Sequence, residues 1–352
     1  EPWTTHGRAA SSRVTATTPM YDPGHIRVQG RTISNWNGAG RGATTFGEGF
    51  QDSANVVFAQ AGRMVGVDDF YAYLDRFGFF DRTGVDLPGE GEFIAPARNR
   101  ATELDLALMA FGQTLATTPI QMSRAISVVA NGGTLITPHV AKALLDAHGN
   151  VVKTYDFPTK KNVISTETAA TVRSLMRRVV ENGTGTAAKI PGYHIGGKTG
   201  TSEKVYGGKV MAGKNIASFI GLVPIEQPRL LIYVMVDEPQ GVPYGGQVAA
   251  PVFHDIAVDV LRHLDIEPQE PEVAVAASAD NVDAAPANDV VTPELAQLAT
   301  GEAVQMARES GLQLEVLGQG SLVLRQIPAA GTVVRRGARI FGYTEKPDNT
   351  SP

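Results

Sequence analysis

A lysine set among glycines and hydroxyl residues is the strongest sign of chemistry in this 352-residue sequence. The stretch reads His194-Ile-Gly-Gly-Lys198-Thr199-Gly200-Thr201. Its glycines predict a strand edge with little side-chain bulk, against which a substrate backbone can lie as an added strand. Lys198 supplies a positive charge and Thr199 and Thr201 supply hydroxyl donors, a combination that suits a terminal carboxylate. The backbone N–H of Thr201 is a candidate oxyanion donor. Taken alone, the pattern is equally typical of a hairpin strand that ends in a glycine turn.

A serine and an asparagine form a second candidate group far upstream. Ser53 and Asn55 stand directly before the apolar run Val56-Val57-Phe58-Ala59, which predicts the start of a buried helix. From one rigid turn, a hydroxyl and a carboxamide can both project into a cleft. The structural alternative is an ordinary helix N-cap, because serine and asparagine are preferred there.

These two motifs, in this order, resemble those of penicillin-recognising serine acyl-transferases. After Tyr21, nearly the whole chain is similar to the transpeptidase domain of a class B penicillin-binding protein. Further stretches carry the resemblance, and we assign no chemistry to them: Phe80 to Glu90, Phe111-Gly112-Gln113, Thr118 to Met122, Asn131 to Thr134 and Thr137-Pro138-His139. The resemblance implies an α+β fold of the β-lactamase/transpeptidase type, an antiparallel sheet flanked by helices. It also implies catalytic roles for Ser53, Asn55 and Lys198, with Ser53 relaying protons, and substrate-binding roles for Thr199, Gly200 and Thr201.

The reaction of the family is D-Ala-D-Ala transpeptidation. A serine attacks the penultimate carbonyl of a stem peptide, D-alanine leaves, and an amine of a neighbouring stem peptide takes the acyl group. The resemblance therefore implies peptidoglycan stem peptides as substrates, β-lactam antibiotics as mimics of the dipeptide, and no metal or organic cofactor. It also implies a role in cell-wall cross-linking during cell division or spore formation, partners among division or spore-wall proteins, and a place on the extracytoplasmic face of the bacterial membrane.

One departure from the family concerns the nucleophile, because the sequence contains no Ser-x-x-Lys motif. Glu1-Pro2 matches the usual lead-in, and Trp3, Thr4 and Gly7 then take the glycine, serine and lysine positions. Glycine cannot accept the proton of an attacking threonine, so no activating base remains. The segment Thr186-Ala-Ala-Lys189 has a similar spacing but falls in the loop before the Lys198 strand, and we reject it as a nucleophile. We therefore predict that the polypeptide as written does not acylate.

Two explanations of the missing motif remain open. Either the start of a working transpeptidase is truncated or misread, or the chain is a degenerate homologue that binds wall peptides without chemistry. The intact Ser53, Asn55 and Lys198 favour the first, and the genomic DNA upstream of Glu1 would separate the two. A serine β-lactamase or a D,D-carboxypeptidase shares these motifs, and a non-catalytic peptidoglycan-binding or β-lactam-binding module is the alternative outside enzymes. The sequence leaves open whether the chain is an enzyme.

Composition excludes several other functions. The formal net charge is −5 and no run of lysine or arginine stands out, which argues against nucleic acid as a partner. Cysteine is absent, and the seven histidines include no pair with zinc-ligand spacing. The longest apolar run, Leu230 to Val236, is far shorter than the ~20 residues that cross a bilayer. We therefore expect a membrane anchor only in a part that precedes Glu1.

Four segments are expected along the chain. Residues 1–20 show no periodicity and predict a loop or an aberrant segment, residues 21–266 the transpeptidase domain, and residues 267–288 an acidic linker. Residues 289–346 resemble a PASTA domain with one short helix over Gly301 to Ser310 and three short strands. Periodicity within the larger domain predicts the following elements: a hairpin about Gly30, a helix over Thr166 to Asn182, strands over Ile216 to Val223 and Leu230 to Val236, and a helix over Val248 to Leu264 with Val252, Ile256 and Val260 at helical spacing.

Overall fold

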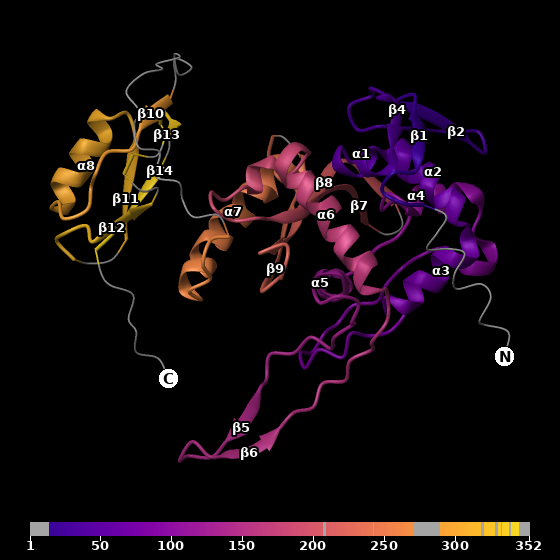
Figure 1. Ribbon diagram of the computed structural model, residues 1–352, viewed down its shortest axis with the longest axis horizontal. Coiled ribbons are helices and arrows are strands. Elements are labelled where there is room, and N and C mark those ends of the chain that lie inside the picture. The colour runs from indigo at the N-terminus through magenta and orange to yellow at the C-terminus, as the bar shows by residue number, and fades with distance from the viewer. Residues whose placement is uncertain are drawn as a thin grey trace. The chain divides into compact units, whose positions relative to one another are not determined.

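The computed structural model describes residues 14–206, 209–241, 243–269, 289–317, 320–327, 330–331, 333–337 and 339–344 (Figure 1). The chain divides into two compact units, Glu1–Val273 and Ala274–Pro352. Thr4 and Gly7 and nearly all of the expected acidic linker lie outside the described residues.

An antiparallel sheet in the order β7-β8-β9 forms the centre of the first unit. Its strands are β7 (Gly196–Tyr206), β8 (Lys209–Val223) and β9 (Leu230–Asp237). Lys198 lies opposite Ile220, and Ile216 lies opposite Asp237. The strands predicted from apolar runs are confirmed, and among the described strands β7 and β9 are the two edges.

Helices cover both faces of this sheet. In β8, Phe219 packs in one cluster with Phe253 of α7 (Gly245–His263), whereas Leu222, on the opposite face by alternation, packs with Met176 of α6 (Thr166–Asn182). The bounds of α6 are those predicted, because the Ser165 hydroxyl accepts a hydrogen bond from Thr168 N–H at its start and a glycine follows its end.

The helix predicted over Val248 to Leu264 is confirmed, but Val252, Ile256 and Val260, at helical spacing, do not form its buried face. Val252 and Ile256 are each 41% exposed, whereas Phe253, Ala257 and Leu261, one position further along, are buried. Both stripes are apolar, so the spacing alone could not identify the stripe that faces the sheet.

A helical layer with two small β-ribbons precedes the sheet in the chain. Its helices are α1 (Phe46–Gln51), α2 (Asn55–Val65), α3 (Val67–Arg76), α4 (Glu103–Met109) and α5 (Pro119–Ala130), with short 3₁₀ turns at Arg98–Arg100 and Thr186–Ala188. Its ribbons pair β1 (Pro19–Asp22) with β4 (Gly42–Thr45) and β2 (His25–Val28) with β3 (Arg31–Ser34). The hairpin predicted about Gly30 is confirmed. The expected N-terminal loop is wrong at its end, because Pro19 and Met20 belong to β1 and Met20 is buried.

A third ribbon, β5 (Ala143–Leu145) with β6 (Val151–Thr154), projects from the same unit (Figure 1). None of the helices in the described residues is long and apolar enough to span a bilayer.

The second unit has a core of its own around Leu295, Ala303, Leu312, Val323 and Ile340. Its helix α8 (Thr300–Glu309) confirms the predicted one to within a residue at each end. The three-stranded sheet orders β11 (Gln313–Leu317), β14 (Arg339–Tyr343) and β12 (Arg325–Ile327), and β10 (Asp289–Val291) pairs with β13 (Val333–Arg335).

Candidate active site

The structure brings Ser53 and Lys198 together although 145 positions separate them in the sequence. The Lys198 Nζ donates a hydrogen bond to Ser53 Oγ at 2.7 Å and a second one to the Thr199 carbonyl oxygen at 3.1 Å. Ser53 comes from the turn between α1 and α2, and Lys198 comes from edge strand β7. A hydroxyl and an amine in direct contact can exchange a proton, which is the elementary step of general acid–base catalysis.

No carboxylate is paired with Lys198 among the interactions of the described residues. The amine loses contact with water on folding, and this desolvation lowers the pKa of Lys198 from 10.5 to about 8. The residue as a whole is half-buried, and its amine donates to Ser53 Oγ and to the Thr199 carbonyl oxygen. Such a lysine holds both protonation states in measurable amounts near neutral pH.

The Ser53 backbone is held in a conformation that non-glycine residues rarely adopt, with φ of 55°. The turn is tight because Ser53 N–H donates to Phe50 O at 3.3 Å and Ala54 N–H donates to Gly49 O at 2.8 Å. At Gly49 any Cβ would collide with the Val57 side chain, so α1 and α2 pack in direct contact. This packing compensates for the unfavourable backbone at Ser53 and fixes the direction of its hydroxyl.

The capping interpretation of the Ser53 and Asn55 motif is wrong. Ala54 is the N-cap residue of α2 and offers no side-chain hydrogen bond, while Asn55 Nδ2 donates to the Ser34 carbonyl oxygen at 3.0 Å. The cap comes from outside the segment, because Asn35 Oδ1 accepts a hydrogen bond from Val56 N–H at 3.1 Å.

A buried carboxylate holds this distant cap in place. Asn35 Nδ2 donates to both carboxylate oxygens of Asp22 at 2.9 Å, and Asp22 and Asn35 are only 3% and 7% exposed. Asp22 also accepts from Gly24 N–H at 2.9 Å. Sequence reasoning missed both residues as part of the site, because neither stands near Ser53 in the chain.

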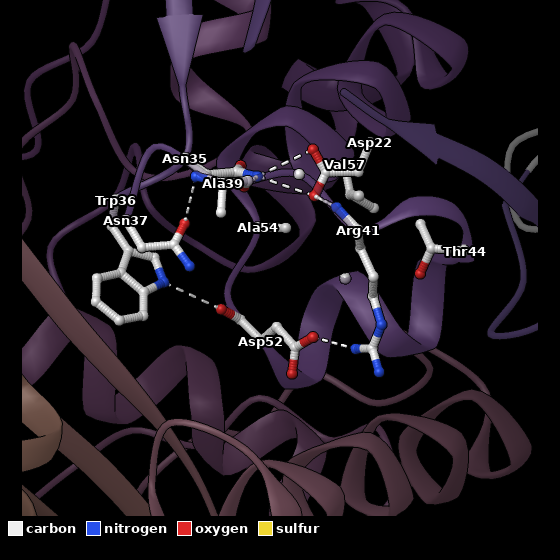
Figure 2. Close-up of a pocket in the computed structure, with 12 residues that line it drawn as sticks. Asp22, Asn35, Trp36, Asn37, Ala39, Arg41, Thr44, Asp52, Ala54 and Val57 are labelled. Atoms are coloured by element: carbon white, nitrogen blue, oxygen red, sulfur yellow. Dashed lines mark hydrogen bonds and ion pairs between the residues drawn. The ribbon is translucent and has the colours of Figure 1, made fainter. Parts of the chain in front are cut away.

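A cavity of about 210 Å³ is lined by Asp52 and Ala54, the residues on either side of Ser53 in the chain (Figure 2). Arg41 forms an ion pair with Asp52 there, and Trp36 Nε1 donates to the Asp52 carbonyl oxygen at 3.4 Å. The Trp36 ring also meets the edge of Tyr244, with centroids 5.4 Å apart. These contacts connect the residue before Ser53 to the N-terminus of α7, which begins after Tyr244.

The two threonines of β7 share the face opposite to Lys198, because successive side chains of a strand alternate. Thr199 Oγ1 lies 2.8 Å from Thr184 Oγ1, and Thr201 Oγ1 accepts from Gly245 N–H at 3.1 Å, where α7 starts. Accepting this bond leaves the Thr201 O–H able to donate to a ligand. The binding roles of Thr199, Gly200 and Thr201, and the oxyanion role of the Thr201 N–H, stay predictions.

The glycines of β7 have packing reasons that the sequence did not show. A Cβ at Gly197 would collide with the Phe219 ring, and one at Gly200 would press on Ser218 Oγ. The bare strand therefore reflects close contact with β8. Its other edge pairs with no strand among the described residues, as expected for a strand that accepts an extended peptide.

One other predicted segment can be located. Thr186 begins a 3₁₀ turn before β7 and Lys189 follows that turn; both are exposed, so the structure places them in the loop expected from the sequence. No group of three His, Asp or Glu side chains in the described ranges could hold a metal ion.

Comparison with known proteins agrees with this geometry. The family model described as the penicillin binding protein transpeptidase domain matches residues 12–257, and the PASTA domain model matches residues 290–341. A curated relative, the stage V sporulation protein D of Bacillus subtilis, is 37% identical over 331 residues, which are 94% of this chain and 50% of that protein. The chain thus spans about half the length of this relative.

Solved structures show the same fold. The transpeptidase domain of penicillin-binding protein 3 from Burkholderia pseudomallei superposes with a TM-score of 0.65 at 32% identity, over 74% of this chain and 76% of that one. Penicillin-binding protein 3 of Mycobacterium tuberculosis, complexed with ampicillin, superposes with a TM-score of 0.67 at 30% identity, over 74% and 60% of the two chains. The matched span contains both Ser53 and Lys198, and on this evidence the chain belongs to the penicillin-binding-protein transpeptidase domain family and carries a PASTA domain after it.

Proposed function

We propose that the β7 edge and the Ser53 turn together form a D,D-transpeptidase-type site. It takes the C-terminal D-Ala-D-Ala end of a peptidoglycan stem peptide, or a β-lactam in its place. The observation that carries the proposal is the 2.7 Å contact between Lys198 Nζ and Ser53 Oγ, which joins the two motifs into one site. In this proposal Ser53 and Lys198 move protons, and the carboxamide of Asn55 faces the substrate backbone.

The carboxylate of the peptide lies at the open edge of β7, where Lys198 supplies charge from one face of the strand and Thr201 supplies a hydroxyl from the other. Lys198 is a cation at neutral pH for most of the population, since its pKa is about 8. Thr201 adds a hydroxyl beside the first turn of α7, and the N-terminal end of that 19-residue helix favours negative charge. An extended peptide can pair with the open edge of β7 at the same time.

The polypeptide of this sequence binds such ligands reversibly, because it has no Ser-x-x-Lys motif to form the acyl-enzyme of the family. It acts on the extracytoplasmic side of the bacterial membrane, in wall synthesis for division or for the spore, with proteins of those processes as partners. This location follows from the nature of the substrate.

Isothermal titration with diacetyl-Lys-D-Ala-D-Ala tests the binding site. We expect saturable binding that Lys198→Met weakens by about tenfold, because a charge-assisted hydrogen bond is removed. Lys204→Met is the matched control on the same strand and should leave the affinity unchanged. Equal binding by Lys198→Met and the unaltered chain would overturn the proposal.

Fluorescent penicillin tests the absence of the acyl-enzyme. We expect no covalent band on a denaturing gel, with a catalytically complete penicillin-binding protein as the positive control. A covalent band on this chain would refute the reversible mode. Turnover of nitrocefin would instead favour a serine β-lactamase, the rival that shares both motifs.

A further inference from the structure

Ser53 has two properties of a nucleophile that the relay role does not require. Its backbone is held at φ of 55°, on a sharp turn that presents the hydroxyl beyond the end of α1. Strained turns of this kind expose the serine of other hydrolytic enzymes to substrate. Among the side chains of the described residues, the hydrogen-bond partner of the Ser53 hydroxyl is the Lys198 amine at 2.7 Å.

We propose that Ser53 and Lys198 form a serine–lysine dyad that accepts an acyl group from small activated esters onto Ser53 Oγ. Nucleophile and base stand within hydrogen-bond reach, which is the geometric requirement for an activated serine. Serine–lysine pairs carry out acyl transfer on several unrelated folds. The proposal concerns Ser53 itself and does not need the missing nucleophile of the family.

The step balances in atoms and charge. The neutral Lys198 amine takes the proton of Ser53 Oγ while the oxygen forms a bond to the ester carbonyl carbon. With a 4-nitrophenyl ester as the acyl donor, the tetrahedral intermediate then collapses. The bond between the carbonyl carbon and the phenolic oxygen breaks, and 4-nitrophenolate leaves with the electron pair. Lys198 releases its proton to solvent, and water can later hydrolyse the acyl-serine in the same manner.

The surroundings of Lys198 let the amine lose its proton. Burial alone depresses its pKa to about 8. Several charged side chains on β7 and on the elements around it have partners other than Lys198: Asp52 pairs with Arg41, Glu48 with Thr44 and Thr45, Arg177 with Glu181 and Glu226, Arg178 with Gln51, and Lys204 with Asp237 and Glu238.

A bound carboxylate should suppress the dyad. An anion beside Lys198 favours the ammonium form and so removes the base. We therefore expect a neutral ester to label Ser53 and a β-lactam, which carries a carboxylate, to leave it unlabelled. The suppression rests on the proposed function, whereas the reactivity of Ser53 does not.

Acetylation by 4-nitrophenyl acetate at pH 8.5 tests the dyad, with the acetyl group located by peptide mass mapping. We expect one acetyl group on Ser53, and a rate of Ser53 labelling about 100-fold lower in Lys198→Met, the size of a general-base contribution. Ser53→Ala should lose the label, while Ser202→Ala and Lys204→Met, both on β7, should keep it. Circular dichroism of every variant is the control that checks whether the fold is kept.

Two outcomes would overturn the dyad. One is the absence of acetyl-Ser53 in the unaltered chain, and the other is equal Ser53 labelling in Lys198→Met. Diacetyl-Lys-D-Ala-D-Ala is then added as a protecting ligand. Labelling without protection, together with no binding in titration, leaves the dyad standing and removes the proposed binding site. Binding in titration without any labelling of Ser53 removes the dyad and leaves the proposed binding site standing.

Discussion

Strand β7 carries two lysines, and their surroundings give them opposite chemistry. Lys204 lies between two carboxylates, with Nζ 2.7 Å from Asp237 Oδ2 and 2.9 Å from Glu238 Oε1, and the hydrogen bond to Asp237 is the main cause of its raised pKa. Lys198 meets a hydroxyl and a carbonyl oxygen, and desolvation lowers its pKa to about 8. One lysine is therefore a fixed cation in a surface ion pair, and the other can act as a base.

The difference comes from the partners that each end of the strand meets. The Lys204 amine meets the end of β9 across the intervening strand β8, where Asp237 is exposed and Glu238 is half-buried. The Lys198 end meets the Ser53 turn, and a buried amine without a carboxylate is tolerated there only because two neutral acceptors satisfy it. Residue type alone does not determine whether a lysine is catalytic; the dielectric surroundings and the charge of the partner do.

The largest effect is expected for Lys198→Arg, a substitution that keeps the positive charge of Lys198 but removes its ability to release a proton. Lys198→Arg keeps a cation, but a guanidinium does not deprotonate in proteins. We expect Ser53 acetylation to fall by about 100-fold, as for any loss of the base. Titration with the D-Ala-D-Ala tripeptide should still show binding. Ser53 labelling by Lys198→Arg at the unaltered rate would show that the amine is not a base.

The residues that support the Ser53 turn give the next largest effect. Asn35→Ala removes the cap on Val56 N–H and two donors to the buried carboxylate of Asp22, so we expect a loss of about 2–3 kcal/mol in the free energy of unfolding. Denaturant unfolding measures this loss. Asn37→Ala is the matched control, because Asn37 lies exposed in the same loop and its side chain accepts a single hydrogen bond, from Ala39 N–H, among the described residues. Equal losses would contradict a special role for the cap.

These supporting residues mark where sequence reasoning stopped. Ser53, Asn55 and Lys198 could be found because each stands in a short motif that keeps its spacing in the chain. Asp22 and Asn35 could not, because their roles depend on how β1 and the loop after β3 pack against α2. Similarly, the periodicity of α7 predicted a helix but not its buried stripe, which only the contact between Phe253 and Phe219 decides.

The pH dependence of Ser53 acetylation sharpens the comparison of the two lysines. Because the Lys198 amine must be neutral, the rate should rise as pH increases through about 8 and level off above it. At pH 7 roughly one tenth of the amine is neutral, so we expect an increase of about eight- to tenfold between pH 7 and pH 9. If the acetylation rate does not change between pH 7 and pH 9, after subtraction of the Ser53→Ala background, the result would contradict a titrating base.

Stability should reveal that the desolvated cation is unfavourable. The folded protein releases the Lys198 proton near pH 8 and the unfolded chain near 10.5, so the unfolded state binds more protons between these values and the free energy of unfolding rises with pH. Lys198→Met removes the unfavourable burial but also two hydrogen bonds, and with the partial exposure of the residue we expect a net gain of only about 1 kcal/mol. The gain is full below pH 8 and shrinks toward pH 10.5. Chemical denaturation at pH 7 and pH 10 measures it.

The smallest effect is expected at the other lysine. Lys204→Met breaks an exposed ion pair, so its effect on stability should be slight and should fade as salt is added. The Ser53 acetylation rate should stay within about twofold of the unaltered chain, because surface charges that distant are screened. This result is the reference for every Lys198 variant, since both substitutions remove one positive charge from the same strand. A loss of acetylation equal to that of Lys198→Met would mean that the net charge of β7, and not the contact with Ser53, controls the reaction.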